Sequence, residues 1–419
     1  MHHFDYRNGR LYAEDVDLAK LAGEIGAPFY VYSEATLRRH IRIFAKAFEG
    51  ADPLVAFSVK ANSNLAVLKI LASEGAGADV VSGGELQRAL RAGIAPEKIV
   101  FSGVGKTGAE MIAALEAGIY QFNVESAPEL DALDAAALSL GKRAPVALRV
   151  NPDIAAGGHD KISTGRKEDK FGISWGQTRD LYTHARSLAG VKVVGVDMHI
   201  GSQISELAPF EAAINKTAGL ISDLRADGCS IERLDVGGGL GIPYGDAAAP
   251  PHPDDYAGLI RKLTKPLGLR LIFEPGRMIA GNAGILITRA VYVKEGEART
   301  FLIVDAAMND LIRPALYDAY HEIIPVVLRE DAPEIVYDVV GPVCESSDFF
   351  AKQRKLPEMR SGDYAAIMSA GAYGAAQASQ YNTRPLIPEV LVNGDKYAII
   401  RRRPTFEEMI ALEATPDWL

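Results

Sequence analysis

Eight short apolar runs, most of them ending on a polar residue, constrain the fold of this chain more than any other feature. The first run, residues 53–60, reads Pro-Leu-Val-Ala-Phe-Ser-Val-Lys. The segments between the runs are rich in Ala, Leu and Glu at helical spacing. Alternating strands and helices predict a parallel sheet, and eight such units predict a closed (β/α)8 barrel. The other seven runs end near Asp79 and Ser82, Ser102, Asn123 and Glu125, Arg149 and Asn151, His199, Asp235 and Gly237, and Glu274.

A second domain is expected because the chain has 419 residues, whereas a simple barrel needs about 250. After Gly281 the pattern changes to strands of period two, which predict an antiparallel β domain. The N-terminal strands, a short first one and an apolar one over residues 28–32, are expected to join it. We therefore predict a barrel over residues 34–277 and a mainly antiparallel β domain over residues 1–33 and 278–419. The expected strands of that domain are 284–294, 300–305, 334–339 and 364–368.

The composition excludes several classes of function. The net charge is −9, and the only basic run is Arg401–Arg403, so no nucleic-acid partner is expected. The chain has two cysteines and therefore no disulfide framework, which fits a reducing compartment. It contains neither His-Glu-x-x-His nor Cys-x-x-Cys, so no metal site is expected. No signal-peptide core and no long apolar span are found, and we expect a cytoplasmic protein without a membrane partner.

Three of the strand ends carry residues suited to catalysis, and in this fold the strand ends meet at one mouth. Lys60 is a candidate Schiff-base lysine, because a partly desolvated ammonium group loses its proton more readily. Its ordinary alternative is a lysine that reaches solvent or pairs with a carboxylate. Glu274 could pair with Arg277 or a lysine, or it could contact the nitrogen of a pyridine ring. His199 could be a core histidine or lie flat against such a ring.

Two glycine loops follow the last two barrel strands. Gly237–Gly239 follows the seventh run, and Gly276 follows the eighth. The first loop is not a dinucleotide-binding fingerprint, because Ile242 stands where that pattern requires its third glycine. Barrels commonly bind phosphate through backbone N–H groups of the loops after strands seven and eight. The pair of loops therefore favours a phosphate site over two plain tight turns.

Cys344 lies in an unusual setting for a cysteine. Residues 341–350 read Gly-Pro-Val-Cys-Glu-Ser-Ser-Asp-Phe-Phe, which is unlike the surroundings of a core cysteine. The thiol is therefore a candidate general acid. A lysine, a phosphate cradle, a pyridine partner and a separate thiol together suit one cofactor, pyridoxal phosphate.

At the level of motifs, the chain resembles the fold-type III pyridoxal-phosphate decarboxylases, and within them the diaminopimelate decarboxylase family. The motifs span almost the whole chain and keep the family's order. The resemblance implies an alanine-racemase-like barrel with a second β domain. The matching segments are residues 58–62 (Ser-Val-Lys-Ala-Asn), 79–85 (Asp-Val-Val-Ser-Gly-Gly-Glu), 199–203 (His-Ile-Gly-Ser-Gln), 235–239 (Asp-Val-Gly-Gly-Gly), 274–277 (Glu-Pro-Gly-Arg), 344–346 (Cys-Glu-Ser) and 371–374 (Gly-Ala-Tyr-Gly).

The resemblance also implies a role for each matching residue. The catalytic residues would be Lys60, which carries the cofactor, His199, which stacks on its ring, Glu274, which meets the pyridine nitrogen, and Cys344, which donates a proton. Pyridoxal 5′-phosphate would be bound by Lys60, Asp79, His199, Ser202, Gly237, Gly238, Gly239, Glu274, Gly276, Arg277 and Tyr373. The substrate would be bound by Arg277, Arg313, Tyr317, Glu345, Ser346 and Tyr373.

The function implied by the resemblance is decarboxylation of meso-2,6-diaminopimelate to L-lysine, the last step of lysine biosynthesis. The enzyme would be a homodimer in which Cys344 and Glu345 reach into the partner's site. Related ornithine-type enzymes have Cys-Asp where this chain has Cys344-Glu345. The segment 157–170, rich in Gly, His, Asp and Lys, is expected to be a mobile loop.

Three alternative functions share some of these features. A basic amino-acid decarboxylase would act on a cationic tail, which Arg277 and Arg313 disfavour. An alanine racemase would use two bases and gives no reason for Cys344 beside Glu345. An inactive paralogue that only binds a partner subunit would not need Lys60, Glu274 and Cys344 together.

Overall fold

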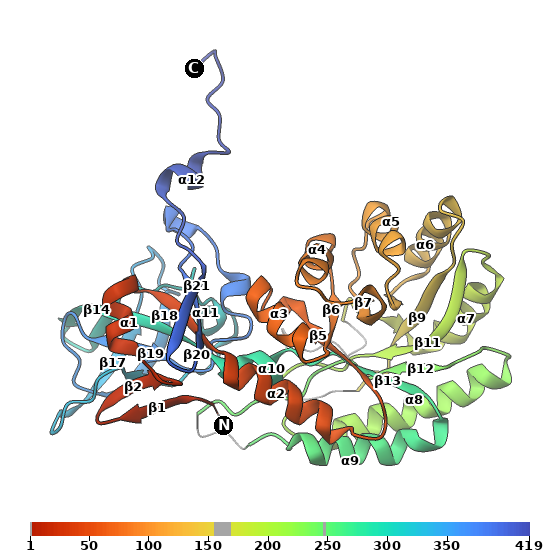
Figure 1. Cartoon of the computed structure of the whole chain (residues 1–419), viewed down its shortest axis with the longest axis horizontal. Coiled ribbons are helices and arrows are strands. Elements are labelled where there is room, and N and C mark those ends of the chain that lie inside the picture. Colours follow the sequence, from red (N-terminus) through yellow and green to blue (C-terminus); the bar gives the residue numbers. More distant parts are fainter. Residues whose placement is uncertain (1, 155–168, 246–248) are drawn as a thin grey trace. The chain divides into compact units, whose positions relative to one another are not determined.

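A computed structural model describes residues 2–154, 169–245 and 249–419 of the chain. These residues form two compact units (Figure 1). The barrel unit spans Leu37–Ile279, and the β unit combines Met1–Thr36 with Ala280–Leu419. The loop predicted over residues 157–170 lies almost wholly outside the described residues.

The barrel unit contains the closed eight-stranded parallel barrel that the apolar runs predict. Each strand pairs in parallel with its neighbour, and pairing of β13 with β5 and of β8 with β9 closes the ring. A two-residue strand, β10 (Ile173–Ser174), adds to β9 outside the ring. In order around the ring the strands are β5 (Leu54–Ser58), β6 (Gly77–Val80), β7 (Ile99–Phe101), β8 (Gln121–Val124), β9 (Ala144–Asn151), β11 (Val191–Met198), β12 (Arg233–Asp235) and β13 (Arg270–Phe273).

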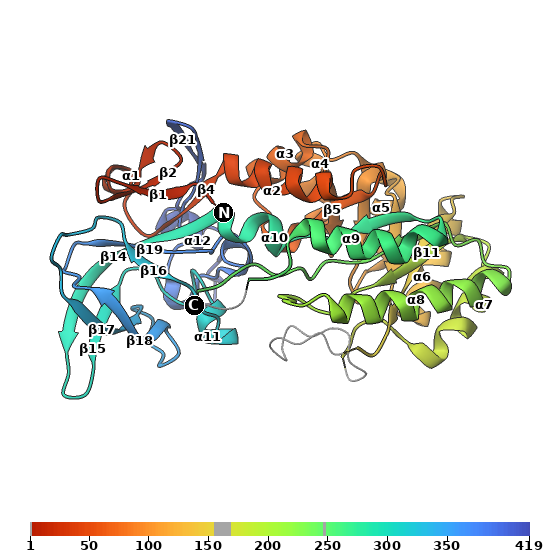
Figure 2. The ribbon, with the colours of Figure 1, turned by 90° about the horizontal axis from the view of Figure 1, so that it is seen from below.

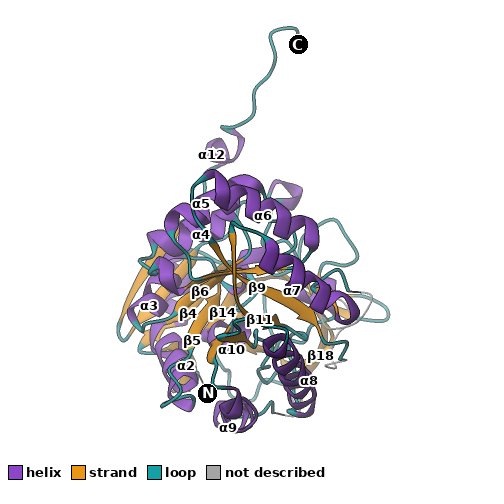
Figure 3. Ribbon diagram, turned by 90° about the vertical axis from the view of Figure 1, so that its right-hand side faces the viewer, coloured by secondary structure: helices purple, strands orange, loops and turns teal. Residues whose placement is uncertain are grey.

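Helices cover the outside of the barrel strands (Figure 3). Local sequence explains their ends: the helix α5 begins with a capping box between Thr107 and Glu110 and ends at Gly118, whose φ is 75°. The strands β5 to β8 are buried at every residue, because helices cover their outer face and side chains fill the barrel interior on their inner face. The helices are α2 (Glu34–Ala47), α3 (Leu65–Ser73), α4 (Gly83–Arg91), α5 (Gly108–Ala117), α6 (Ala127–Ser139), α7 (Thr178–Ser187), α8 (Ala208–Ala226), α9 (Pro253–Thr264) and α10 (Arg277–Ala280).

The barrel interior changes from apolar to polar along the strands. Near the amino ends, Leu54, Ala56, Val100 and Ile272 pack into one buried cluster. Inward-facing residues alternate along a strand, so the next inward position after Ala56 is Ser58. The same step of two leads from Val100 to Ser102 after β7 and from Ile272 to Glu274 after β13, which places polar side chains at the carboxyl end.

A nine-stranded sheet forms the centre of the β unit, in the order β18-β17-β15-β14-β4-β20-β21, with β19 on β14 and β16 on β19 (Figure 2). Most pairs are antiparallel, as predicted, but β15 pairs in parallel with β17 and β20 with β4. The strands are β4 (Phe29–Ser33), β14 (Gly284–Glu295), β15 (Thr300–Val304), β16 (Ile323–Pro325), β17 (Glu334–Val340), β18 (Phe349–Pro357), β19 (Tyr364–Ile367), β20 (Glu389–Asn393) and β21 (Lys396–Arg401).

The N-terminal segment only partly follows the expectation that it joins this sheet. The strand β4 lies between β14 and β20. The strands β1 (Phe4–Arg7), β2 (Arg10–Ala13) and β3 (Val16–Asp17) form a separate sheet. The turn Asn8-Gly9, with φ of 50° and 72°, folds β1 back on β2. The remaining helices of the unit are α1 (Leu18–Ile25), α11 (Arg313–Tyr317) and α12 (Phe406–Ile410). Across the described residues, no helix has both the length and the apolar character needed to cross a membrane.

Candidate active site

A ring of eight buried polar residues, one within two residues of the end of each barrel strand, lines the carboxyl end of the barrel. Each of the eight residues is at most 8% exposed. We call this ring the polar layer. Because the strands are parallel, their carboxyl ends meet here, as the fold predicts. The polar layer consists of Ser58, Asp79, Ser102, Asn123, Arg149, Asp197, Asp235 and Glu274.

Asn123 connects several members of the polar layer. Its Nδ2 lies 3.3 Å from Oε1 of Glu274, 3.0 Å from Oδ2 of Asp235 and 3.1 Å from Oγ of Ser102. Its Oδ1 accepts a hydrogen bond of 2.8 Å from Gln121, which fixes which end of the amide donates. An amide NH2 has two hydrogens for these three acceptors, so the group is fully used. Asn123 therefore holds the Glu274 carboxyl in one orientation.

Burial dominates the protonation of the carboxyl groups in the polar layer. Loss of water raises the pKa of Glu274 well above its usual range, and the nearby Asp235 and Asp79 raise it further. Lys60 and Arg149 act in the opposite direction. Burial, followed by Asp197, likewise raises the pKa of Asp235. A cation placed against Glu274 would favour its ionised form, because opposite charge offsets the loss of solvation.

Lys60 stands at the rim of the polar layer, on the turn that directly follows β5. Its Nζ donates to Oδ2 of Asp79 at 2.6 Å. The Lys60 side chain is 40% exposed, whereas that of Asp79 is fully buried. Ser58 donates to the same Asp79 oxygen at 2.8 Å. The structure thus shows the carboxylate pairing that was the ordinary alternative for Lys60, and it leaves part of the Lys60 side chain exposed.

His199 follows β11 and is held by the glycine loop. The backbone N–H of Gly238 donates to its Nδ1 at 3.1 Å. An N–H can only donate, so Nδ1 carries no proton. Burial, followed by Arg149 and Lys60, lowers the pKa of His199 well below its usual range. The imidazole is therefore neutral, with its proton on Nε2.

The loop Gly237–Gly239 can accept no side chain. A Cβ on Gly237 would lie 2.7 Å from Nδ1 of His199, and one on Gly238 would lie 2.3 Å from the backbone oxygen of Glu274. Gly239 adopts φ of +109°, which side chains rarely allow. The loop thus brings bare backbone against the two neighbouring strand ends.

Arg277 begins α10 and contacts residues from two other loops. Its Nη2 donates to Oγ of Ser202 at 3.2 Å, and its Nη1 donates to Oη of Tyr244 at 2.9 Å. Tyr244 was missed by the sequence analysis, although it lies five residues after the glycine loop. The carboxyl end of the barrel therefore brings together these predicted residues: Lys60, Asp79, His199, Ser202, Gly237, Gly238, Gly239, Glu274, Gly276 and Arg277.

The other predicted residues belong to the β unit. Cys344 and Glu345 lie in the loop between β17 and β18, and the Cys344 thiol is exposed. Asp348 fixes this loop by accepting hydrogen bonds from the backbone N–H groups of Met308 at 2.7 Å and Val343 at 2.6 Å. This exposure agrees with the prediction that Cys344 is not a core cysteine.

Tyr381 was not predicted as a site residue, yet it contacts the same loop. Its Oη donates to Oε1 of Glu345 at 2.5 Å, and Ser347 donates to Oε2 at 2.9 Å. These hydrogen bonds lower the pKa of Glu345, Tyr381 being the larger cause. Glu345 is therefore held as an oriented carboxylate.

Arg313 and Tyr317 are the first and last residues of α11. Nη1 of Arg313 lies 2.9 Å from Nε2 of His321, a residue that the sequence analysis did not single out. Tyr373 lies in the loop after β19, with φ of 56°. A non-glycine residue in this left-handed region is uncommon and often marks a functional site.

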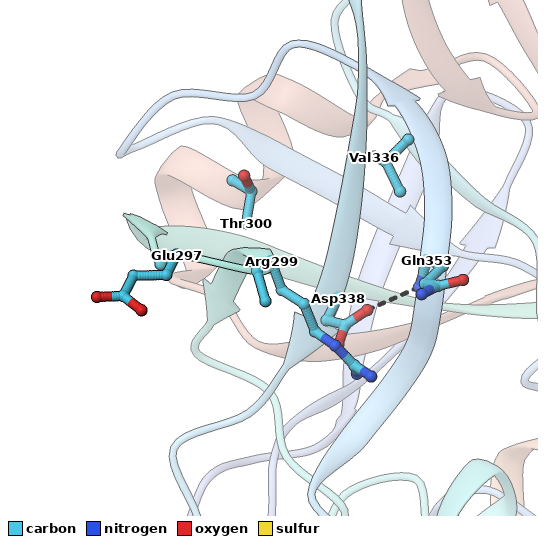
Figure 4. A pocket seen from close by; sticks show the side chains of 8 residues that line it. Glu297, Arg299, Thr300, Val336, Asp338 and Gln353 are labelled. Carbon is cyan, nitrogen blue, oxygen red and sulfur yellow. Dashed lines mark hydrogen bonds and ion pairs between the residues drawn. The ribbon is translucent and has the colours of Figure 1, made fainter.

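Two pockets are lined by residues other than the predicted site residues. In the β unit a pocket of about 320 Å3 contains Arg299, whose Nη1 is 2.7 Å from Oδ2 of Asp338 (Figure 4). In the barrel unit a more open pocket of about 690 Å3 lies between residues 125–128 and 172–184. Among the described residues, no group of three or more His, Cys, Asp or Glu side chains could hold a metal ion.

Comparison with known proteins connects this geometry to one family. Residues 34–281 match the family model described as pyridoxal-dependent decarboxylase, pyridoxal binding domain. The chain is 49% identical to a diaminopimelate decarboxylase of Zymomonas mobilis, with 99% of each chain covered. It is 50% identical to that of Haemophilus influenzae, covering 99% of this chain and all of the relative.

Solved structures agree. The diaminopimelate decarboxylase of Helicobacter pylori complexed with L-lysine superposes with a TM-score of 0.91 at 42% identity, covering 94% of this chain and 99% of that one. The M. jannaschii enzyme, also in complex with L-lysine, gives a TM-score of 0.95 at 37% identity over 99% and 98% of the two chains. The chain therefore belongs to the pyridoxal-dependent decarboxylases, and within them to the diaminopimelate decarboxylase family.

Proposed function

We propose that this chain decarboxylates meso-2,6-diaminopimelate to L-lysine and carbon dioxide, the last step of lysine biosynthesis, with pyridoxal 5′-phosphate at the mouth of the barrel. The observation that supports this most is the arrangement around Glu274. A buried carboxyl, a neutral imidazole and a partly exposed lysine gather at one end of the barrel, beside a loop of bare backbone.

The residues at the mouth fit the chemistry of pyridoxal phosphate. Its aldehyde requires a primary amine, which Lys60 offers, and its ring nitrogen requires an acidic partner, which Glu274 offers. Its phosphate suits the bare backbone N–H groups of Gly237–Gly239, a loop at which no side chain fits. Arg277 and Ser202, which are hydrogen-bonded to each other, offer further donors. When bound, the cofactor supplies an electron sink for the carbon that loses its carboxylate.

The residues of the chain would divide the remaining tasks. Glu274 would keep the ring nitrogen protonated, and Asn123 would hold Glu274 in place for it. His199, neutral and fixed through Nδ1, would pack against the ring without adding charge to it. Asp79, paired with Lys60, would stabilise the protonated form of its amine whenever that amine is not linked to the cofactor. Cys344 would hold the proton that replaces the departing carboxylate.

Substrate selection would depend on charge at the distal end of the substrate. We assign its distal carboxylate to Arg277, Arg313 and Tyr317, because guanidinium groups bind carboxylates through strong, charge-assisted hydrogen bonds. Glu345 would face the distal ammonium, with Ser346 and Tyr373 completing the site. A substrate without the distal carboxylate would lose these charge-assisted hydrogen bonds in a buried site, at a cost of roughly 3–5 kcal/mol.

Assembly as a homodimer is part of the proposal. Cys344 and Glu345 belong to the β unit, whereas Lys60 belongs to the barrel unit. We propose that two copies share their sites, each copy supplying these two residues to the other. We also propose that the enzyme works in the cytoplasm, because its exposed thiol must stay reduced to carry a proton.

A decarboxylation assay tests this function. Purified protein supplied with pyridoxal phosphate should release L-lysine from meso-diaminopimelate, and it should favour that substrate over ornithine by on the order of 10²–10³ in kcat/KM. Equal turnover of ornithine would favour a basic amino-acid decarboxylase and overturn the substrate assignment. Racemisation of an amino acid without release of carbon dioxide would overturn the reaction class.

A further inference from the structure

His321 is a fully buried histidine whose two ring nitrogens are both engaged. Its Nδ1 lies 2.8 Å from the backbone oxygen of Met368, and its Nε2 lies 2.9 Å from Nη1 of Arg313. The residue is 0% exposed, and Arg313 is 6% exposed. The imidazole thus bridges the β sheet and the arginine assigned to the distal carboxylate.

The partners of the ring determine its protonation. A carbonyl oxygen can only accept a hydrogen bond, so Nδ1 must carry a proton in order to donate to Met368. A guanidinium nitrogen can only donate, so Nε2 must be unprotonated in order to accept from Arg313. These two contacts together select the neutral imidazole with its proton on Nδ1.

The sheet fixes the position of His321 closely. His321 and Glu322 lead into β16, and Met368 directly follows β19, with which β16 pairs. The N–H of Met368 donates to the backbone oxygen of Glu322 at 2.8 Å. Nη1 of Arg354, on β18, donates to the backbone oxygen of His321 at 2.9 Å. Backbone on both sides of the imidazole is therefore held by the fold.

A neutral acceptor has a particular consequence for a carboxylate-binding arginine. A carboxylate beside the guanidinium would orient it equally well but would offset its positive charge. The imidazole of His321 orients the guanidinium without contributing negative charge. In a buried site, where charges are weakly screened, that difference is large for an anionic ligand.

We infer that His321 is a positioning residue for substrate recognition: its neutral imidazole holds the Arg313 guanidinium in the orientation that binds the distal carboxylate of a diamino diacid, without offsetting its charge. The inference rests on the proposed function, in which Arg313 binds that carboxylate. Because His321 acts through Arg313, it should affect capture of the substrate much more than the bond cleavage itself.

Three substitutions at this position separate orientation from charge. His321→Phe fills the space but removes the acceptor, and it should raise KM for diaminopimelate roughly 10- to 100-fold with kcat and the cofactor absorbance little changed. His321→Gln restores a neutral acceptor and should recover most of the lost affinity. His321→Glu restores an acceptor of the same length with a negative charge, and its KM should be clearly higher than that of His321→Gln.

A double-mutant cycle with Arg313→Ala separates the proposed role of Arg313 from the inference about His321. In the Arg313→Ala background, His321→Phe should change KM no further, because its effect passes through Arg313. Tyr182→Phe is a matched control. It removes one buried hydrogen bond, of 2.8 Å to the backbone oxygen of Gly195, and both of these residues belong to the barrel unit, whereas His321 belongs to the β unit. It should lower the melting temperature and leave KM unchanged.

Each outcome decides the question. If Arg313→Ala leaves KM unchanged, the proposed role of Arg313 is wrong. If Arg313→Ala raises KM but His321→Phe does not, only the inference about His321 is wrong. If His321→Phe fails to fold, the comparison of His321→Gln with His321→Glu still tests it, and equal KM values in that pair would overturn the role of charge.

Discussion

At the scale of single residues, burial controls the chemistry of the ionisable groups more than their charged neighbours do. In the polar layer, desolvation is the largest cause of the raised pKa values of Glu274, Asp235 and Asp197. Such groups favour their neutral forms unless a cation is bound nearby. The same effect acts in the β unit on Asp310, where it can be measured without a cofactor.

The buried carboxyl of Asp310 should make the stability of the fold depend on pH. Burial raises the pKa of Asp310 from 3.8 to about 6. Between these values the folded chain binds the proton and the unfolded chain does not, so the free energy of unfolding falls as pH rises through this range. The expected loss is about 3 kcal/mol at most. Asp310→Asn removes this titration, so its stability relative to the unaltered protein, measured by urea unfolding, should increase from pH 4 to pH 7. A difference that does not change with pH would contradict this assignment.

The roles that depend on distant contacts could not be predicted from single residues. Lys60, His199 and Glu274 were singled out because each closes an apolar run, a position that is visible in the sequence alone. Asn123 also closes such a run, but its three hydrogen bonds depend on how four strands meet. His321 and Tyr381 close no run, and their partners lie 8 and 36 residues away in sequence.

At the scale of elements, the glycine loop after β12 carries the closest backbone approach in the site. A Cβ at Gly238 would lie 2.3 Å from the backbone oxygen of Glu274, which cannot move as a flexible side chain would. The loop and the end of β13 must therefore shift together if any side chain is added. A control variant can separate the effect of such a shift on cofactor binding from the general effect of replacing a glycine with alanine.

Gly238→Ala should weaken pyridoxal-phosphate binding at least about tenfold and destabilise the barrel by roughly 1–3 kcal/mol, because the added methyl overpacks the loop. Absorbance titration of the cofactor and thermal unfolding measure the two effects. Gly258→Ala, within α9, is the matched control: its Cβ would meet nothing within 4 Å, and alanine favours helix. Equal cofactor affinity in the two variants would show that the loop does not hold the phosphate.

Elements with strong periodicity were predicted, and those without it were not. The eight barrel strands were all found, as were β14, β15, β17 and β19. β18 carries the exposed residues Lys352, Gln353 and Lys355, and β21 is mostly exposed, so neither shows the alternation of a half-buried strand. Their strand conformation comes from pairing with β17 and β20, which only the folded chain supplies.

At the scale of the whole molecule, the residues of the proposed site divide between the two units. Lys60, His199, Glu274 and Arg277 belong to the barrel unit, whereas Cys344 belongs to the β unit together with Arg313 and Glu345. One chain can therefore carry a defect in either set while the other set remains intact. This division makes the proposed sharing of sites between two copies testable by mixing defective chains.

Mixing Lys60→Ala chains with Cys344→Ala chains should restore activity. Half of the dimers formed at random would contain one chain of each kind, and one of their two sites would be intact, which gives about a quarter of full activity. Decarboxylation is measured before and after the chains exchange, and each variant alone serves as the control. If subunit exchange is demonstrated and no activity returns, each chain completes its own site.

The central claim is that Lys60, at the mouth of the barrel, carries pyridoxal phosphate. Borohydride reduction of the purified protein with its cofactor, followed by peptide mapping, tests this most directly, because reduction makes the link between amine and cofactor permanent. We expect one labelled peptide, containing Lys60, and no label in Lys60→Ala. A label on any other lysine, or none in the unaltered protein, would contradict it.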